Sequence, residues 1–127
     1  MDSSLSLVNA SVILRTKEAF SIWCQRIVPH MPRIARYTTG ARIENHFLDL
    51  IELIYKAYYT PLESKSGKIV ECISKNDIIK YLLQIAFENK FIKEKEYLEL
   101  SEKLQEVGKI LGGWKKGIEE KLKTPAE

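Results

Sequence analysis

The chain has 127 residues, of which 45% are hydrophobic and 29% charged, and a formal net charge of +3 at pH 7. This size and composition are typical of a single globular domain over residues 1–127, and they exclude a disordered tail or a collagen-like repeat. No apolar run approaches the roughly 18–20 residues that a membrane-spanning helix needs, and the N-terminus lacks the basic start of a secretory signal. We therefore expect a cytoplasmic protein.

Apolar residues recur at helical spacing in four stretches, and no stretch shows the alternation of a strand. Pro29 stops the first predicted helix, and Pro61 follows the second, which begins after a Thr-Thr-Gly turn. In the fourth, apolar residues alternate at three and four positions from Tyr97 to Ile118, as in the seam of a bundle. The four predicted helices cover about 10–28, 41–59, 68–89 and 94–121. Their short connections favour an all-α, up-down-up-down antiparallel four-helix bundle.

The second and third predicted helices carry more apolar residues than one core face needs. Eight of the ten residues from Ile78 to Phe87 are apolar, and Leu48 and Tyr55 widen the apolar arc of the second helix. Such excess apolar surface predicts self-association, and the alternative is a generously packed monomer core. The polar residues of the third helix form one strip at i, i+4 spacing, which we expect to face solvent: Asn76, Lys80, Gln84 and Glu88.

The residues that carry most enzyme chemistry are sparse. A di-iron bundle needs Glu-x-x-His pairs on facing helices, whereas this chain has only His30, between prolines, and His46. No glycine-rich phosphate loop or Cys-x-x-Cys pair occurs. Cys24 and Cys72 fall within apolar helical patterns, which indicates reduced core thiols. We therefore expect no catalytic residue, no metal, no cofactor and no enzyme activity.

Basic residues gather in the N-terminal third of the chain and at the end of the fourth predicted helix. Lys115 and Lys116 have a simple explanation, because cations near a helix C-terminus interact favourably with the helix dipole. Arg33, Arg36 and Arg42 crowd a loop and a helix N-terminus, where the dipole disfavours cations, so a partner's phosphates or carboxylates are a reasonable cause. In an antiparallel bundle these two clusters lie at opposite ends.

Two segments carry a resemblance to a known family. "IVPHMPRIARYTTGARIENHFLDLIELIYKAYY" leads from a proline-rich basic stretch through Arg-Tyr-Thr and glycine into the second helix, and "LQEVGKILGGWKKG" contains a Glu-Val-Gly-basic-x-Leu-Gly-x-Trp run. Over about residues 15–118 the chain resembles the accessory variability determinant (Avd) proteins of diversity-generating retroelements. These belong to a wider group of four-helix bundles that includes the intervening-sequence proteins of large ribosomal RNA genes. The Ser-Ile-Pro-Ala-Asn-Ile-Ala-Glu-Gly-like segment of that second branch has no counterpart here.

The resemblance implies a homopentameric, barrel-like assembly that binds the element's reverse transcriptase and nucleic acid, RNA or DNA. In the family this supports mutagenic copying of a template RNA into cDNA and retrohoming. Family basic residues lie one turn apart in the third helix and in the glycine-rich stretch of the fourth. The matching positions here are Lys80, Gln84 and Lys109, of which Gln84 departs from the basic pattern. The alternative function is a protein-only oligomeric scaffold, or an intervening-sequence-type bundle without nucleic-acid binding.

Glycines interrupt the fourth helix although each costs about 0.8–1 kcal/mol relative to alanine. Gly108 and Gly112 are four residues apart, so they lie on one flank of the helix and remove side-chain bulk beside the seam. We expect close packing there, either against the first helix of the same chain or against another subunit or partner. Trp114 is most simply a core residue that locks the seam.

Overall fold

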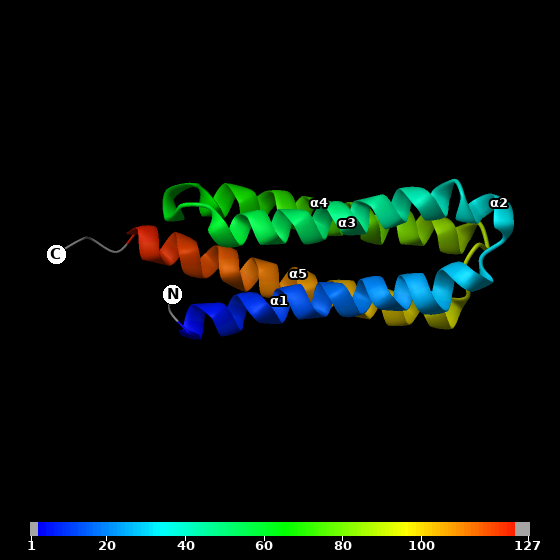
Figure 1. Cartoon of the computed structure of the whole chain (residues 1–127), viewed down its shortest axis with the longest axis horizontal. Coiled ribbons are helices and arrows are strands. Elements are labelled where there is room, and N and C mark those ends of the chain that lie inside the picture. The colour runs from blue at the N-terminus through cyan, green and yellow to red at the C-terminus, as the bar shows by residue number, and fades with distance from the viewer. Residues whose placement is uncertain (1–2, 124–127) are drawn as a thin grey trace.

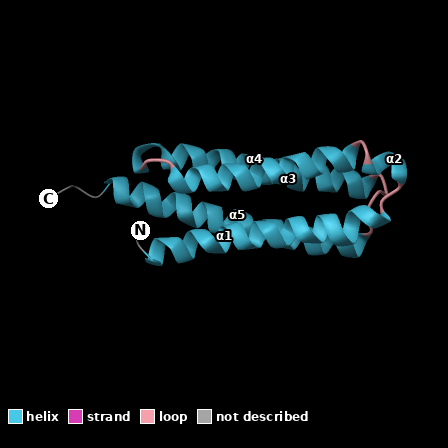
Figure 2. Ribbon diagram, viewed as in Figure 1, coloured by secondary structure: helices cyan, strands magenta, loops and turns pink. Residues whose placement is uncertain are grey.

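The computed structural model describes residues 3–123, which are helical along almost their whole length. Four long helices run antiparallel and are joined at alternate ends of an elongated bundle (Figure 1). They are α1 (Ser3–Ile22), α3 (Thr39–Tyr59), α4 (Leu62–Glu88) and α5 (Glu94–Lys123), with a short helix α2 (Arg33–Arg36) between α1 and α3. The predicted all-α, up-down-up-down bundle is confirmed for this part of the chain, which contains no strand (Figure 2).

The helices form a ring in which each packs against two neighbours. Helix α4 lies between α3 and α5, and α1 closes the ring by packing against both α3 and α5. Ion pairs join the first helix and the turn after it to α5. The guanidinium of Arg26, four residues after the end of α1, contacts Glu99 of α5 at 2.7 Å, and Lys103 of α5 lies 3.8 Å from Glu18 of α1. The start of α1 and the end of α5 lie at one end of the bundle, and α2 lies at the other (Figure 1).

The core confirms the predicted seam of the last helix. Its buried side chains are Leu100, Leu104, Val107, Leu111, Trp114 and Ile118. Tyr97 begins the seam half-buried and stacks on Phe87 of α4 with ring centroids 4.6 Å apart. On the other side of the core, Phe47 of α3 packs against Trp23 at 6.3 Å. The first aromatic contact packs α4 against α5, and the second packs α3 against the turn that follows α1.

Helix boundaries differ from the sequence-based expectation at proline and glycine positions. Helix α1 begins at Ser3 rather than about residue 10, and its path continues as a π turn, Trp23–Ile27, and a 3₁₀ turn, Val28–His30. Pro29 explains this change, because it has no N–H to donate and its ring crowds the preceding turn. Helix α4 begins at Leu62, directly after Pro61, rather than at about residue 68. Gly67 is therefore inside the helix.

The expected Thr-Thr-Gly turn is also helical. Thr39 and Gly40 form the first turn of α3, and Gly40 is buried. A Cβ atom at Gly40 would meet the carbonyl oxygen of Ala35 at 3.1 Å and the side chain of Met31 at 3.4 Å. The glycine therefore permits the close approach of α2 and its preceding turn to the start of α3.

The polar strip of α4 does not face solvent along its whole length. Gln84 and Glu88 are exposed, Lys80 is half-buried, and Asn76 is only 1% exposed. Asn76 Nδ2 donates a hydrogen bond to the carbonyl oxygen of Leu104 at 3.0 Å. The expectation for Asn76 was wrong, and its amide instead joins α4 to α5.

Several large apolar side chains remain exposed on the outer surfaces of α3 and α4. They are Leu48, Tyr55, Tyr59, Leu62, Val70, Ile78 and Tyr81. Of the described helices, none is long and apolar enough to cross a membrane.

Candidate nucleic-acid and partner interface

Lys80 and Lys109 lie on adjacent helices that the Asn76 contact sets in register. Asn76 of α4 lies level with Leu104 and Gly108 of α5, because its amide reaches both residues. Lys80 lies one turn beyond Asn76 along α4. Lys109 follows Gly108 along α5, which runs in the opposite direction to α4. The two lysines are therefore roughly 10 Å apart along the bundle axis. Neither has an ion-pair or hydrogen-bond partner in the described part of the chain. Both ammonium groups are therefore free to meet an anion.

Gln84, the third position that the resemblance indicates, is exposed on α4 one turn beyond Lys80. Its amide carries no charge, so it offers hydrogen bonds but no electrostatic attraction to a phosphate. The positive charge that α4 presents here comes from Lys80 alone.

The two glycines beside this region differ in their surroundings. A Cβ atom at Gly108 would meet Asn76 Nδ2 at 3.3 Å, whereas one at Gly112 would meet no other atom within 4 Å. The close neighbour of Gly108 is thus α4, and the expected contact with the first helix was wrong. Gly112 makes no close contact within the described residues, so the first helix is not its neighbour there, and close packing against another subunit or partner stays a prediction.

The three arginines around α2 have different roles. Arg33 and Arg42 are exposed and, within the described residues, make no ion pair. Arg36 Nη2 instead donates to the carbonyl oxygens of Pro29 at 3.1 Å and Met31 at 3.3 Å. Arg36 therefore braces the turn between α1 and α2, and Arg33 and Arg42 supply the accessible charge.

The lysines at the end of α5 also differ from one another. Lys115 pairs with Glu119, one turn further along the helix, and this ion pair lowers the pKa of the Glu119 carboxyl group. Lys116 is exposed and has no such partner in the part of the chain that the structure describes. These lysines lie at the end of the bundle opposite α2, as expected, so the two basic clusters are separate surfaces (Figure 1).

A buried lysine that the sequence did not reveal lies under Trp114. Lys65 of α4 is 7% exposed, and its ammonium group donates to the carbonyl oxygens of Ala57 at 2.9 Å and Tyr58 at 2.7 Å. Its Nζ also lies 5.9 Å from the centre of the Trp114 ring, an arrangement that favours a cation–π contact. Burial lowers the pKa of Lys65, and the nearby charge of Lys121 lowers it further. Lys65 therefore fastens the end of α3 to α4 and α5.

His46 takes part in a polar contact between α3 and α4. Lys75 Nζ donates to His46 Nδ1 at 3.1 Å and lies 3.7 Å from an oxygen of Asp49. Burial lowers the pKa of His46, and the charges of Lys75 and Arg42 lower it further, although Asp49 opposes them. His46 accordingly accepts a hydrogen bond in its neutral form. It is a packing residue of this seam and makes no contact that activates a nucleophile.

The cysteines are not arranged for reaction. Burial is the largest cause that raises the pKa of the Cys72 thiol to about 12, and burial also raises the pKa of Cys24. A thiol with a raised pKa is a poor nucleophile at neutral pH. Among the residues that the structure describes, no group of three or more His, Cys, Asp or Glu side chains could hold a metal ion.

Comparison with known proteins agrees with the resemblance that the two sequence motifs carry. The model of a family described as bAvd-like matches residues 11–118. No curated protein and no solved structure matches the chain. Because the family match covers well over half of its residues, this chain belongs to the bAvd-like family.

Proposed function

We propose that this chain is a non-enzymatic accessory protein of a diversity-generating retroelement. It binds the element's reverse transcriptase and nucleic acid, either template RNA or cDNA, and thereby supports mutagenic reverse transcription and retrohoming in the cytoplasm. The family match over residues 11–118 carries this proposal. The free cations of α4 and α5 are consistent with it, because Lys80 and Lys109 are available to phosphates.

The protein acts as a homo-oligomer in this proposal, with five subunits expected from the resemblance. The exposed apolar side chains of α3 and α4 support assembly, because monomeric proteins rarely leave large apolar patches in water. A five-fold assembly would also repeat each basic site five times, so that weak individual contacts act together through avidity. Light scattering should give a mass several times 14.7 kDa. A monomer at micromolar concentration would contradict the assembly.

Substitution of Lys80 and Lys109 tests the nucleic-acid part of the proposal. The double variant Lys80→Ala/Lys109→Ala should bind RNA or DNA more weakly than the wild type, with a smaller dependence of affinity on salt, because fewer counterions are released. Fluorescence anisotropy at two salt concentrations measures both effects. Lys56→Ala/Lys95→Ala is the matched control, since it removes two exposed lysines from other parts of the bundle.

Equal loss in both double variants would show that only total charge matters and that no site exists at Lys80 and Lys109. Co-purification with the reverse transcriptase of the same element tests the protein partner. If the wild type binds neither nucleic acid at low salt nor the reverse transcriptase, the adaptor function fails. A protein-only oligomeric scaffold is then the remaining function.

A further inference from the structure

The turn around α2 displays two apolar side chains that the rest of the chain does not cover. Ile34 is 77% exposed and Tyr37 is 68% exposed, the largest exposures among the large apolar side chains of residues 11–123. Both belong to the segment between α1 and α3, at the end of the bundle away from the chain termini (Figure 1). These aliphatic and aromatic side chains, three residues apart in sequence, leave apolar area in water that a partner can cover.

This segment is held firmly despite its exposure. Arg36 bonds to the carbonyl oxygens of Pro29 and Met31, and the Thr38 hydroxyl donates to the Ile34 carbonyl oxygen at 2.8 Å. On its inner side Ala35 is buried against the start of α3, where Gly40 allows close approach. Ile34 and Tyr37 are therefore presented from a fixed backbone, which lowers the entropy lost when a partner binds.

The charged side chains of this segment itself all have one sign. Residues 28–43 contain three arginines and no aspartate or glutamate. Arg33 and Arg42 are exposed and unpaired among the described residues, so their charges are not neutralised within the chain. A surface that complements this end of the molecule must therefore be acidic.

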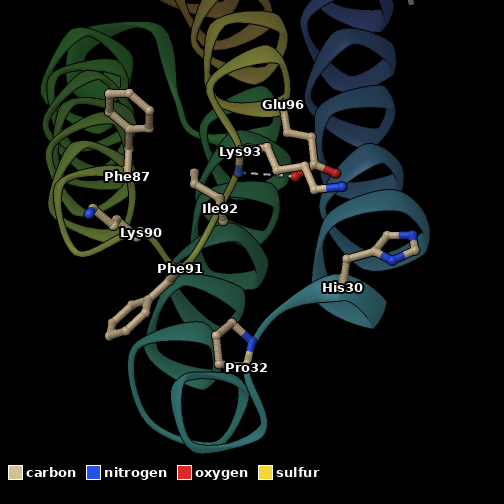
Figure 3. Close-up of a pocket in the computed structure, with 8 residues that line it drawn as sticks. All are labelled: His30, Pro32, Phe87, Lys90, Phe91, Ile92, Lys93 and Glu96. Carbon is tan, nitrogen blue, oxygen red and sulfur yellow. Dashed lines mark hydrogen bonds between the residues drawn. The ribbon is translucent and has the colours of Figure 1, made fainter.

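A hollow of about 350 Å³ opens beside α2, between the α1–α2 turn and the α4–α5 loop. Its lining includes Pro32, which immediately precedes α2, and Ile92, together with Lys90 and Lys93. It also includes one carboxylate, Glu96, which accepts a hydrogen bond from the backbone N–H of Lys93 at 3.2 Å. In Figure 3 the chain of the α4–α5 loop runs past Pro32, and His30 stands at the edge with its ring directed away from the loop. The hollow is large enough for one apolar side chain of a partner, and its lysines are compatible with an acidic neighbour.

We infer that the α2 end of the bundle is a docking surface for a protein whose apolar side chains are surrounded by carboxylates. Ile34 and Tyr37 pack against the apolar part of that partner, and Arg33 and Arg42 pair with its carboxylates. Tyrosine and arginine are the residue types that most often dominate binding energy in protein interfaces. This inference rests on the proposed function and deepens it, because it names the surface that meets the protein partner.

The exposed isoleucine favours a protein partner over a nucleic acid. Arginine and tyrosine suit both, since arginine pairs with phosphate and tyrosine stacks on bases. An aliphatic side chain gains most from an apolar pocket, which a phosphate backbone does not provide.

The test measures binding of the element's reverse transcriptase to the variant Ile34→Ser/Tyr37→Ser by surface plasmon resonance. We expect affinity at least about tenfold weaker than that of the wild type, and a smaller loss for Arg33→Ser that disappears at high salt. The control is Leu14→Ser/Leu98→Ser, because these leucines are exposed to a similar degree, 58% and 57%, elsewhere on the bundle. Circular dichroism and light scattering establish that each variant keeps its helices and its mass.

The outcomes distinguish failure of this inference from failure of the proposed function. If the wild type binds the reverse transcriptase and Ile34→Ser/Tyr37→Ser binds it equally well, the docking surface is wrong and the proposed function stands. If the wild type does not bind, the reverse-transcriptase part of the proposed function fails and the inference fails with it. Lower affinity for RNA with unchanged affinity for the protein would make this a nucleic-acid surface. A changed mass would make it a contact between subunits, and either result overturns the inference.

Discussion

At each end of the bundle a cationic side chain donates hydrogen bonds to backbone carbonyl oxygens, but the two side chains stabilise different parts of the structure. At the α3–α4 end, the Lys65 ammonium group binds the carbonyl oxygens of Ala57 and Tyr58 beneath the Trp114 ring. At the α2 end, Arg36 binds carbonyl oxygens of its own turn only. Lys65 thus links three helices and is covered by them, whereas Arg36 shapes a projecting segment.

This difference indicates that one end secures the bundle and the other displays side chains. Thr60 and Pro61 alone separate α3 from α4. At the end of α3 the buried lysine donates to the carbonyl oxygen of Tyr58 and to that of Ala57, which also accepts from the Thr60 N–H at 3.2 Å. The connection at the α2 end is longer and leaves Ile34 and Tyr37 exposed. We therefore assign the stabilising contacts of Lys65 to the α3–α4 end and the proposed docking surface to the α2 end.

The largest expected effect is the loss of the buried cation. Lys65→Met keeps most of the apolar stem but removes both hydrogen bonds, and we expect the free energy of unfolding to fall by about 2–3 kcal/mol, since bonds to charged groups are strong and buried carbonyls are costly to leave unpaired. Arg36→Met should cost about 1 kcal/mol, because its carbonyl partners are nearer to water. Urea unfolding at equal chain concentration measures both. An equal or larger cost for Arg36→Met would contradict the assignment of stability to the α3–α4 end.

A smaller effect is expected from adding a methyl group at two glycines. Gly40→Ala should destabilise the α2 end by about 1–3 kcal/mol, because its Cβ would meet a backbone carbonyl oxygen at 3.1 Å. Gly112→Ala should stabilise α5 by up to about 1 kcal/mol, since the site is open within the chain and alanine favours a helix.

Thermal unfolding and light scattering distinguish the outcomes for these glycine variants. Stabilisation of Gly112→Ala with an unchanged mass would show that no subunit packs there. A reduced mass would instead show that Gly112 lies in a subunit interface. If Gly40→Ala is as stable as the wild type, the close approach of α2 to α3 is looser than the contact distances indicate.

The smallest effect is expected on acidification. The pKa of His46 is lowered in the folded chain, so between that pKa and the ordinary value of about 6.5 the unfolded chain binds more protons. The contribution of His46 to stability is therefore fully present above pH of about 6.5 and is lost as the pH falls through the folded pKa. His46→Gln should reduce this decrease in melting temperature between neutral and mildly acidic pH.

Hydrogen exchange should place the acid effect in the first turns of α3, because His46 lies in the part of α3 nearer to α2. Exchange that increases first around Lys65 would contradict this location. An unchanged pH dependence in His46→Gln would show that the carboxyl groups, and not His46, cause the decrease.

Long helices with one buried face could be predicted from the sequence, because spacing alone determines which side chains share a face. The seam of α5 from Leu100 to Ile118 is the best example. The polar strip of α4 was predicted less well, since residues four apart are turned by about 40° from one another and the strip drifts around the helix. Asn76 is consequently buried, while Gln84 and Glu88 are exposed.

The helical spacing of apolar residues in the sequence did not predict the features that distinguish the two ends. Helix α2 is too short to show a repeating pattern, so the display of Ile34 and Tyr37 could not be inferred. Lys65 was missed because the third helix was expected to begin at about residue 68, whereas it begins at Leu62. Its carbonyl partners belong to another helix, so only the three-dimensional packing brings them together.

The placement of Ser3 and Lys123 has a practical consequence for measuring these interactions. The first residue of α1 and the last residue of α5 both lie at the end away from α2 (Figure 1). A chain attached to a sensor through a tag at either terminus therefore stands with α2 toward the solution. Immobilisation leaves the Ile34 and Tyr37 surface accessible, and a bulky fused reporter at either terminus should not block it.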